Sequence, residues 1–397
     1  MKNIKKEHVA LLLVSVGWFL ILSGRYSISS LLVNIENELG IGHTEAGIAL
    51  SAMWLFYGLM QFPSGIFSDI KGRKISIILS MTVFSFAYLM LGFSVHYVMF
   101  FFSVILLGMS TGGYPTVGIA MLTDIFKEKR GKALGIHSSA GSLAGVAPII
   151  ASIIAAFYDW RLFFIIWAAI SFVAMLVFLR KTWESTTLPP QVSLKERVMD
   201  GFSVFKFKKI WLFFFVNLSL AFSWIGYMSF YPTYLIEGKG FSEIQAGLAL
   251  AVLATSGLLL KPIIGSLSDK HNKKLIIFIL TLLSASGTLL LVFAEFLPLI
   301  FLISFLLSFT SGAFPVISSY LMDQWGEKGR GGKLGFYRSQ IILFGSPISA
   351  YIGFTASRYG FWLPFLTISA ILFTSSTVMM ISILLDRNRE KNKKVDG

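Results

Sequence analysis

Residues 9–33 read VALLLVSVGWFLILSGRYSISSLLV, an apolar run in which Arg25 is the single charged side chain. About 20 such residues in a helix are enough to cross the hydrocarbon core of a bilayer. Lys2, Lys5 and Lys6 precede the run, but no small-residue cleavage pattern follows it. The run is therefore expected to remain in the protein as a membrane-spanning helix, not to be removed as a signal peptide.

Runs of this kind recur along the 397 residues, which are 55% hydrophobic and only 14% charged. A soluble domain has about 25% charged residues, and a membrane barrel needs alternating strand patterns that this sequence lacks. The chain has no cysteine, which excludes disulfides and thiolate metal sites. We predict an all-α membrane protein with twelve transmembrane helices, at residues 9–33, 46–69, 75–96, 98–124, 133–157, 160–182, 209–236, 245–269, 275–295, 298–324, 333–357 and 361–385.

The net charge of +14 has a strongly uneven distribution along the chain. If the N-terminus is cytoplasmic, 28 of the 34 Lys and Arg residues fall in the cytoplasmic segments. The outer loops then hold three, namely Arg161, Lys239 and Arg358. The positive-inside rule then places both termini in the cytoplasm. We expect a multi-pass protein of the plasma (inner) membrane. We also expect it to be monomeric. The basic residues indicate topology, and no nucleic-acid partner is expected.

The sequence repeats itself at an offset of 200 residues. Gly40 recurs as Gly240, and Gly65 with Asp69 recurs as Gly265 with Asp269. Six predicted spans separate the copies, so the two halves share one orientation in the membrane. We predict an N-terminal six-helix bundle (1–182), a cytoplasmic central loop (183–208) and a C-terminal six-helix bundle with a short basic tail (209–397). A capping pattern at Ser193 and Glu196 indicates a surface helix in the central loop, with a flexible tether as the alternative.

Residues 65–74 read GIFSDIKGRK, and residues 265–274 read GSLSDKHNKK. The first segment resembles the G-x-L-x-D-R-x-G-R-K signature of the major facilitator superfamily, and the second is a degenerate copy. The resemblance covers the whole chain, because the twelve predicted spans, the repeat and the central loop also match. It implies the major facilitator fold and transport by alternating access.

The resemblance also implies which residues control the conformational change. Asp69 is expected to meet the start of span 11 near Gly331–Lys333, and Arg73 to pair with Asp124. These contacts would hold the halves together in the outward-facing state. The alternative is that this loop is basic only to fix topology. The expected gating residues are Gly65, Asp69, Gly72, Arg73, Asp124, Asp269, Lys273 and Asp323.

Three cations lie inside the predicted spans: Arg25, Lys261 and Arg338. An ionisable group inside a membrane span is costly and marks a candidate functional site. The spans contain no carboxylate deeper than their ends, where Asp69, Asp124, Asp269 and Asp323 lie. An excess of cations indicates an anionic substrate.

The setting of Arg25, LSGRYSIS (22–29), resembles the D-R-x-x-L-S segment of organic-anion transporters of this superfamily, in which the arginine binds the substrate carboxylate. Lys261 and Pro262 resemble the R-P-x-x-G element of monocarboxylate carriers. The alternative for each cation is that it extends to the nearer membrane surface, most simply for Arg338.

Aromatic and amide side chains form a further group of candidates. We expect Tyr26, Tyr57, Gln61, Tyr227 and Tyr231 to contact the substrate. Tyr227 and Tyr231 lie on one face of span 7, and Gln61 is the repeat partner of Lys261. Such stripes also arise from packing between helices.

Two departures from the organic-anion transporters concern coupling. Gly24 stands where these relatives carry a carboxylate, and span 4 (GMSTGGYP, 108–115) lacks their glutamate. The coupling mode is left open: symport with H⁺ or Na⁺, a proton carried by the substrate's own carboxyl or by His137, exchange, or facilitated diffusion. No cofactor or metal is expected.

These observations favour a secondary active transporter for a small organic anion, most simply a carboxylate. The alternative is an efflux pump for drugs or hydrophobic metabolites, and a non-transporting membrane receptor is a more distant one. An enzyme is not expected, because the sequence has no nucleophile elbow, phosphate loop or metal-ligand cluster.

Overall fold

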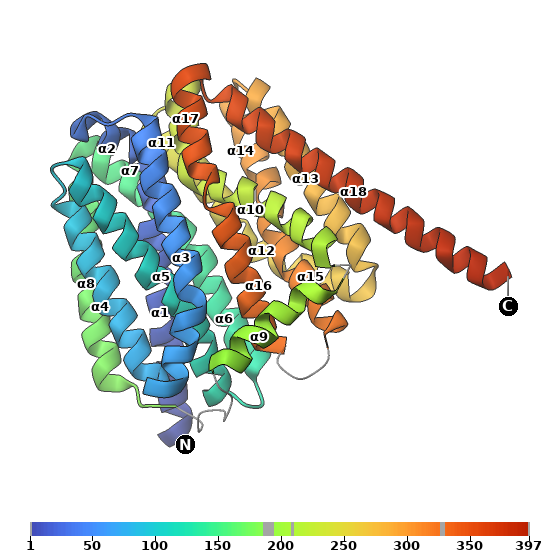
Figure 1. Ribbon diagram of the computed structural model, residues 1–397. Helices are drawn as coiled ribbons and strands as arrows, with labels where there is room; N and C mark the ends of the chain where they lie inside the picture. Colours follow the sequence, from blue (N-terminus) through green and yellow to red (C-terminus); the bar gives the residue numbers. More distant parts are fainter. Residues whose placement is uncertain (1, 186–193, 208–209, 326–329, 396–397) are drawn as a thin grey trace.

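The computed structural model (Figure 1) describes residues 2–185, 194–207, 210–325 and 330–395, and every regular element in these ranges is helical. The first half of the chain contains α1 (Lys2–Ser30), α2 (Leu32–Leu39), α3 (His43–Lys71), α4 (Arg73–Gly92), α5 (Tyr97–Ile125), α6 (Arg130–Leu143), η1 (Ala144–Val146), α7 (Ala147–Phe157) and α8 (Trp160–Lys181). The connecting segment contains α9 (Leu194–Ser203) and η2 (Val204–Lys206).

The second half contains α10 (Ile210–Thr233), η3 (Tyr234–Gly238), α11 (Glu243–Thr255), α12 (Gly257–Lys270), α13 (Lys273–Phe293), α14 (Leu297–Leu307), α15 (Phe309–Gln324), α16 (Arg330–Gly345), α17 (Ile348–Tyr359) and α18 (Trp362–Val395). The C-terminal part of α18 extends beyond the bundle in Figure 1. Basic side chains at the α3–α4 and α12–α13 connections, such as Arg73 and Lys273, define what we call the basic end. The opposite end contains the α2–α3 connection.

Eleven helical segments of the described residues are long and apolar enough to cross a membrane. They correspond to the expected spans with one exception, the span at 333–357. There the chain forms α16 and α17, which are separated at Ser346 and Pro347. Proline has no backbone N–H and cannot continue the helical hydrogen-bond ladder, which accounts for a break at this position.

The 200-residue repeat is visible in the backbone. Gly40 ends α2 with φ 63°, and Gly240 follows η3 with φ 73°. Both lie in the left-handed region, which glycine enters without a steric penalty. The helix interrupted at η1 in the first half and the α16–α17 break in the second half form another matching pair. The repeated glycines thus correspond to equivalent turns.

The segment α16–α17 packs antiparallel against α3. The Ser339 hydroxyl donates to the Gly58 carbonyl oxygen at 2.7 Å, and the Ala350 N–H donates to the Ser51 hydroxyl at 2.8 Å. The contacts continue to Thr44 and Ser357, whose hydroxyl oxygens are 3.1 Å apart. Because α3 is itself long and apolar enough to cross a membrane, α16 and α17 together extend along most of one span.

The helix expected in the connecting segment is present as α9, although Ser193 of its capping pattern lies outside the described residues. A Cβ on Gly201 would lie 2.7 Å from the ring of Phe336, so α9 packs closely on α16. Lys333 Nζ is 3.3 Å from Asp200 Oδ1. These contacts attach α9 to the second half.

The two ends of the bundle are packed differently. At the opposite end, a Cβ on Gly353 would lie 2.0 Å from the carbonyl oxygen of His43, so α17 and α3 touch backbone to backbone. At the basic end, a Cβ would meet no atom of the described residues within 4 Å at five helical glycines: Gly131, Gly135, Gly265, Gly332 and Gly335. Among the described residues, the halves therefore touch at the opposite end, whereas these glycines have no close neighbour at the basic end.

Candidate functional site

Arg25 lies on α1 inside a group of aromatic rings. Its guanidinium carbon is 4.5 Å from the ring centre of Trp54, 4.8 Å from that of Tyr57 and 5.7 Å from that of Tyr26. Trp54 and Tyr57 are three residues apart on α3, a spacing that puts both on one helix face. Only 5% of the Arg25 side chain is exposed, so the rings hold the cation by cation–π attraction in a dehydrated setting.

The Arg25 guanidinium is incompletely hydrogen-bonded. Its Nε and Nη1 atoms are buried and have no hydrogen-bond partner within the part of the chain that the structure describes. A buried donor left without a partner costs about 1–3 kcal/mol, and more when it is charged. Nε–H points to the Nη2 side of the guanidinium, so these two donors lie on different edges, each of which also has an Nη2–H; arginine binds a carboxylate with the two parallel donors of one edge. An anion on either edge would therefore satisfy one of the two donors while the rings cover the faces of the guanidinium.

The neighbouring Tyr88 of α4 explains why residue 24 has no side chain. The Tyr88 hydroxyl lies 3.0 Å from the carbonyl oxygens of both Leu20 and Ile21. A Cβ on Gly24 would lie 2.2 Å from the Tyr88 ring and hydroxyl. The space that a side chain at position 24 would need is thus filled by Tyr88, a contact that sequence reasoning missed because it connects two spans.

Lys261 lies on α12 and faces the first half. Its Nζ is 3.4 Å from the hydroxyl oxygen of Ser142 on α6, which is at the limit of a hydrogen bond. The side chain is half-buried, and the charge of Arg338 on α16 repels it. Arg338 itself is exposed. Lys261 therefore contacts α6, whereas Arg25 contacts α3, and their contacts share no residue.

Tyr227 and Tyr231 on α10 are fully buried, and their hydroxyls are engaged within the second half. Tyr227 is hydrogen-bonded to Thr288, and the Tyr231 hydroxyl is 2.7 Å from that of Ser304. These hydrogen bonds match the alternative given for the tyrosine stripe, in which the tyrosines pack against neighbouring helices. Gln61, by contrast, is half-buried on α3, one turn beyond Tyr57.

The expected pairing of Arg73 with Asp124 is present, but it joins α4 and α5 of the first half, so this pair does not itself connect the two halves. Arg73 Nε is 3.3 Å from Asp124 Oδ2, and its Nη1 is 2.5 Å from Asp69 Oδ1. In the second copy of the motif, Lys273 Nζ is 2.5 Å from Asp323 Oδ2, while Asp269 is exposed. Arg73 and Lys273 thus occupy equivalent positions in the two copies of the motif.

The turn between α3 and α4 needs Gly72, which has φ 107°. The Glu184 carboxylate accepts a hydrogen bond from the Arg73 N–H at 2.7 Å and so caps the start of α4. Sequence reasoning missed this cap because Glu184 is more than 100 residues away. Gly65 faces α5, where a Cβ would lie 3.4 Å from Thr116. The gating role of these residues stays a prediction, as does a contact of Asp69 with the segment Gly331–Lys333.

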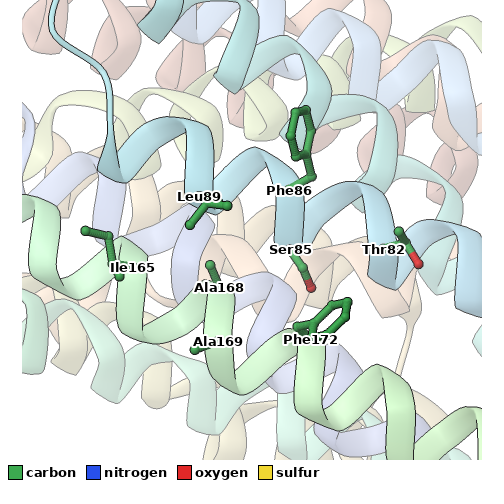
Figure 2. Close-up of a pocket in the computed structure, with 8 residues that line it drawn as sticks. All are labelled: Thr82, Ser85, Phe86, Leu89, Ile165, Ala168, Ala169 and Phe172. Atoms are coloured by element: carbon green, nitrogen blue, oxygen red, sulfur yellow. The ribbon is translucent and has the colours of Figure 1, made fainter.

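A groove of about 420 Å³ lies between α4 and α8, and Figure 2 shows the side chains that line it. Its two hydroxyl side chains, Thr82 and Ser85, donate to carbonyl oxygens of their own helix, those of Ile78 and Met81. The remaining lining is apolar: Phe86, Leu89, Ile165, Ala168, Ala169 and Phe172. The groove has no charged lining residue and none of the predicted site residues, so it does not have the character of an anion site.

A second polar cluster, which sequence reasoning missed, lies at the opposite end. His43 on α3 contacts Glu36 of α2 through Nδ1 at 3.0 Å and Glu237 of η3 through Nε2 at 2.9 Å. His137, the suggested proton carrier, is instead stacked on Trp18, with 5.9 Å between ring centres. Both of its ring nitrogens lack a hydrogen-bond partner within the described residues.

Several known proteins are similar to this chain. The probable sulfoacetate transporter SauU of Cupriavidus necator is 28% identical over 69% of this chain and 67% of its own length. The glycerol-3-phosphate transporter of Bacillus subtilis is 26% identical over 66% of this chain and 65% of its own length. This chain therefore spans about two thirds of each of these relatives. The multidrug resistance protein MdtG of Yersinia enterocolitica is 26% identical over 80% of this chain and 81% of its own length.

Among solved structures, a bacterial homologue of the human lysosomal transporter Spinster, in an inward-facing and unoccupied conformation, has a TM-score of 0.80 at 16% identity. The comparison covers 95% of this chain and 96% of that one. The sequence profile described as "Major Facilitator Superfamily" matches residues 14–260 and 213–397, which is nearly the whole chain. The chain is thus a multi-pass membrane protein of a transporter family, not an enzyme, and it belongs to the Major Facilitator Superfamily.

Proposed function

We propose that the protein transports a small organic anion, most simply a carboxylate, across the plasma membrane by alternating access. Arg25 is the main anion contact. The observation that carries this proposal is the buried guanidinium, whose Nε and Nη1 have no hydrogen-bond partner among the described residues. An isolated buried charge is costly, and a bound anion would both pair the charge and accept a hydrogen bond from one of these donors.

The relatives support an anionic substrate. They are named as transporters of sulfoacetate, glycerol-3-phosphate, nitrate and hexuronate, all of which are anions. In the same proposal, Lys261 contributes a second positive charge from the other half. Its flexible stem suits anions of different lengths, since a lysine ammonium acts as a point charge and not as a planar fork.

We also propose the topology of the transporter. The segment α16–α17 makes a twelfth crossing, which its antiparallel packing along α3 supports. The basic end faces the cytoplasm, in agreement with the positive-inside rule. The structure then corresponds to an arrangement closed toward the outside, in which residues of the α3–α4 and α12–α13 connections act in gating.

Efflux of drugs or hydrophobic metabolites is the second candidate function. It is favoured by the MdtG relatives in three organisms, which are 25–28% identical to this chain. The rings of Trp54, Tyr57 and Tyr26 would also suit an apolar compound. The two candidates differ in what they require of Arg25, because an apolar substrate does not need its charge.

The test is uptake into liposomes that contain the purified protein. The panel comprises labelled mono- and dicarboxylates, sugar acids, sulfonates, phosphate esters, one neutral sugar and one hydrophobic dye. Each compound is measured with no gradient, with a proton gradient and with a sodium gradient. We expect uptake of at least one anion, and competition among anions of the same class.

Two outcomes would contradict the proposal. Movement of the neutral sugar or the dye with no anion uptake would show that the substrate class is wrong. Anion uptake that is equally fast in an Arg25→Gln variant would show that the substrate class is right and that the site is elsewhere.

A further inference from the structure

The His43 cluster joins the two halves of the protein. Glu36 and His43 belong to the first half, whereas Glu237 belongs to the second. The imidazole also contacts two rings of the second half, with ring centres 4.9 Å from Phe361 and 6.5 Å from Phe230. The His43 side chain is 20% exposed and that of Glu36 only 5%. Separation of the halves at this end would therefore have to break the His43–Glu237 contact.

The geometry of the closed cluster fixes a minimum number of protons. Both ring nitrogens of His43 lie within 3.1 Å of a carboxylate oxygen. A neutral imidazole has one N–H and one lone pair, so it can donate to one carboxylate only. The second nitrogen would then face the lone pairs of the other carboxylate. The observed arrangement thus needs one additional proton, either on the imidazole or on a carboxyl group.

We propose that His43, Glu36 and Glu237 form a proton-binding site that keeps this end of the protein closed. When the halves separate, Glu237 leaves and the requirement for the additional proton disappears. Closure is therefore coupled to proton uptake, and acid on this side favours the closed arrangement. The proton enters and leaves at the same end, so the site senses pH without a proton crossing the membrane. This proposal concerns a different site from the anion site and does not rest on it.

The charged surroundings of the cluster agree with proton binding. Burial raises the pKa of the Glu36 carboxyl, an effect that the hydrogen bond from His43 opposes. Nearby acidic groups are Glu45, whose carboxylate accepts from the Gly42 N–H at 3.1 Å, and Glu243, which accepts from the Asn34 amide at 3.0 Å. The nearby cations are engaged elsewhere, Lys239 on the Val292 carbonyl, Arg358 over the Phe354 ring and Arg161 on Glu38.

The chain has no cysteine, so two introduced cysteines can carry spin labels without background. Val95 and Phe296 are each 66% exposed and lie at the opposite end in different halves, between α4 and α5 and between α13 and α14. The experiment measures the distance between labels at Val95→Cys and Phe296→Cys by double electron–electron resonance, in lipid nanodiscs without substrate. The pH is varied from about 10 to about 5, a range that extends above the one in which an isolated histidine titrates, because neighbouring carboxylates favour the protonated imidazole.

We expect the ratio of closed to open molecules to rise up to about tenfold per pH unit as the pH falls, as for one coupled proton. Glu237→Gln should keep the contact but lose this slope, because a glutamine amide can donate to the free nitrogen of a neutral imidazole. His43→Gln should also lose the slope. Thr44→Val, which removes the hydrogen bond to Ser357, is the matched control: it should shift the population and keep the slope.

An unchanged slope in both Glu237→Gln and His43→Gln would overturn the proposal, provided that both variants elute as folded protein. Glu36, His43 and Glu237 also lie close enough together to hold a metal ion. All samples are therefore measured with and without a chelator, and a slope that vanishes with the chelator would overturn the assignment to a proton. Because no substrate is present, these results are independent of whether the protein transports an anion.

Discussion

The two cations proposed to contact the substrate, Arg25 in the first half and Lys261 in the second, have very different surroundings. Three aromatic rings surround Arg25, which is 5% exposed and whose Nε and Nη1 have no hydrogen-bond partner in the described ranges. Lys261 is half-buried, approaches a serine hydroxyl at 3.4 Å and is repelled by a second cation. The comparison indicates that Arg25 is held in place before a substrate arrives, whereas Lys261 can change its position. We therefore expect substitutions of the two to differ in both size and kind of effect.

The largest effect is expected for Arg25→Gln, which should lower the initial uptake rate at least about 100-fold. The loss of two charge-assisted hydrogen bonds, each contributing about 1.5–3 kcal/mol, accounts for this magnitude. The same variant should melt at a higher temperature without substrate, because an unpaired buried charge is removed. Uptake and thermal unfolding of the same preparation test both expectations.

Arg25→Lys is the matched control for this prediction. It keeps the positive charge but loses the planar fork, so we expect an intermediate uptake rate. A melting temperature of Arg25→Gln below that of the wild type would contradict the interpretation of Arg25 as an unpaired cation and would indicate a structural role instead.

A smaller effect, a loss of about tenfold in the uptake rate, is expected for Lys261→Gln. The pair that Lys261 would form with the bound anion is half-buried, and losing one charge of such a pair costs less than losing one charge of a fully buried pair. The loss should appear mainly as a higher KM and should be larger for dicarboxylates than for monocarboxylates. Arg338→Gln, a change of the same kind at an exposed position, provides the control and should alter uptake less. Equal losses for Lys261→Gln and Arg25→Gln would remove the proposed difference between the two cations.

The rings around Arg25 should have a still smaller influence. Cation–π attraction contributes about 0.5–2 kcal/mol, so Trp54→Leu should weaken anion uptake roughly 2–30-fold. Trp54→Phe keeps an aromatic face and should lie close to the wild type. If Trp54→Leu increased anion uptake, the ring would be an obstacle to the substrate and not a support for Arg25.

The smallest effect on transport is expected for Tyr231→Phe. The hydroxyl is bonded to Ser304 within the second half, so its removal should cost about 1 kcal/mol of stability and change uptake less than twofold. Thermal unfolding measures the structural role of the hydroxyl, and uptake measures its role in substrate binding. A large loss of uptake with unchanged stability would indicate that Tyr231 contacts the substrate, as the sequence predicted.

The fold was largely predictable from the sequence because hydropathy and charge act locally along the chain. Eleven expected spans correspond to helical segments in the structure, and Gly40 and Gly240 form equivalent turns. The span at 333–357 is not among them; there the chain forms α16 and α17, with Ser346 and Pro347 between them. Residues 186–193 of the connecting segment lie outside the described residues.

The site was less predictable, because its character depends on contacts between distant residues. The sequence singled out Arg25, but it could not show that Trp54 and Tyr57 would cover the guanidinium. It placed Tyr227 and Tyr231 on one helix face correctly, but it could not tell that their hydroxyls meet Thr288 and Ser304. The His43 cluster gave no signal at all, since Glu36 and Glu237 are about 200 residues apart in the sequence.

The contact between Gly24 and Tyr88 has a consequence for how such proteins can evolve. A carboxylate before the arginine, at position 24, would require Tyr88 to move or to become smaller, because the Tyr88 ring and hydroxyl would lie 2.2 Å from the new Cβ. Either change would disturb the hydrogen bonds of Tyr88 to α1. Homologues should therefore show correlated identities at these two positions: glycine opposite a large aromatic residue, and an acidic residue only opposite a small one.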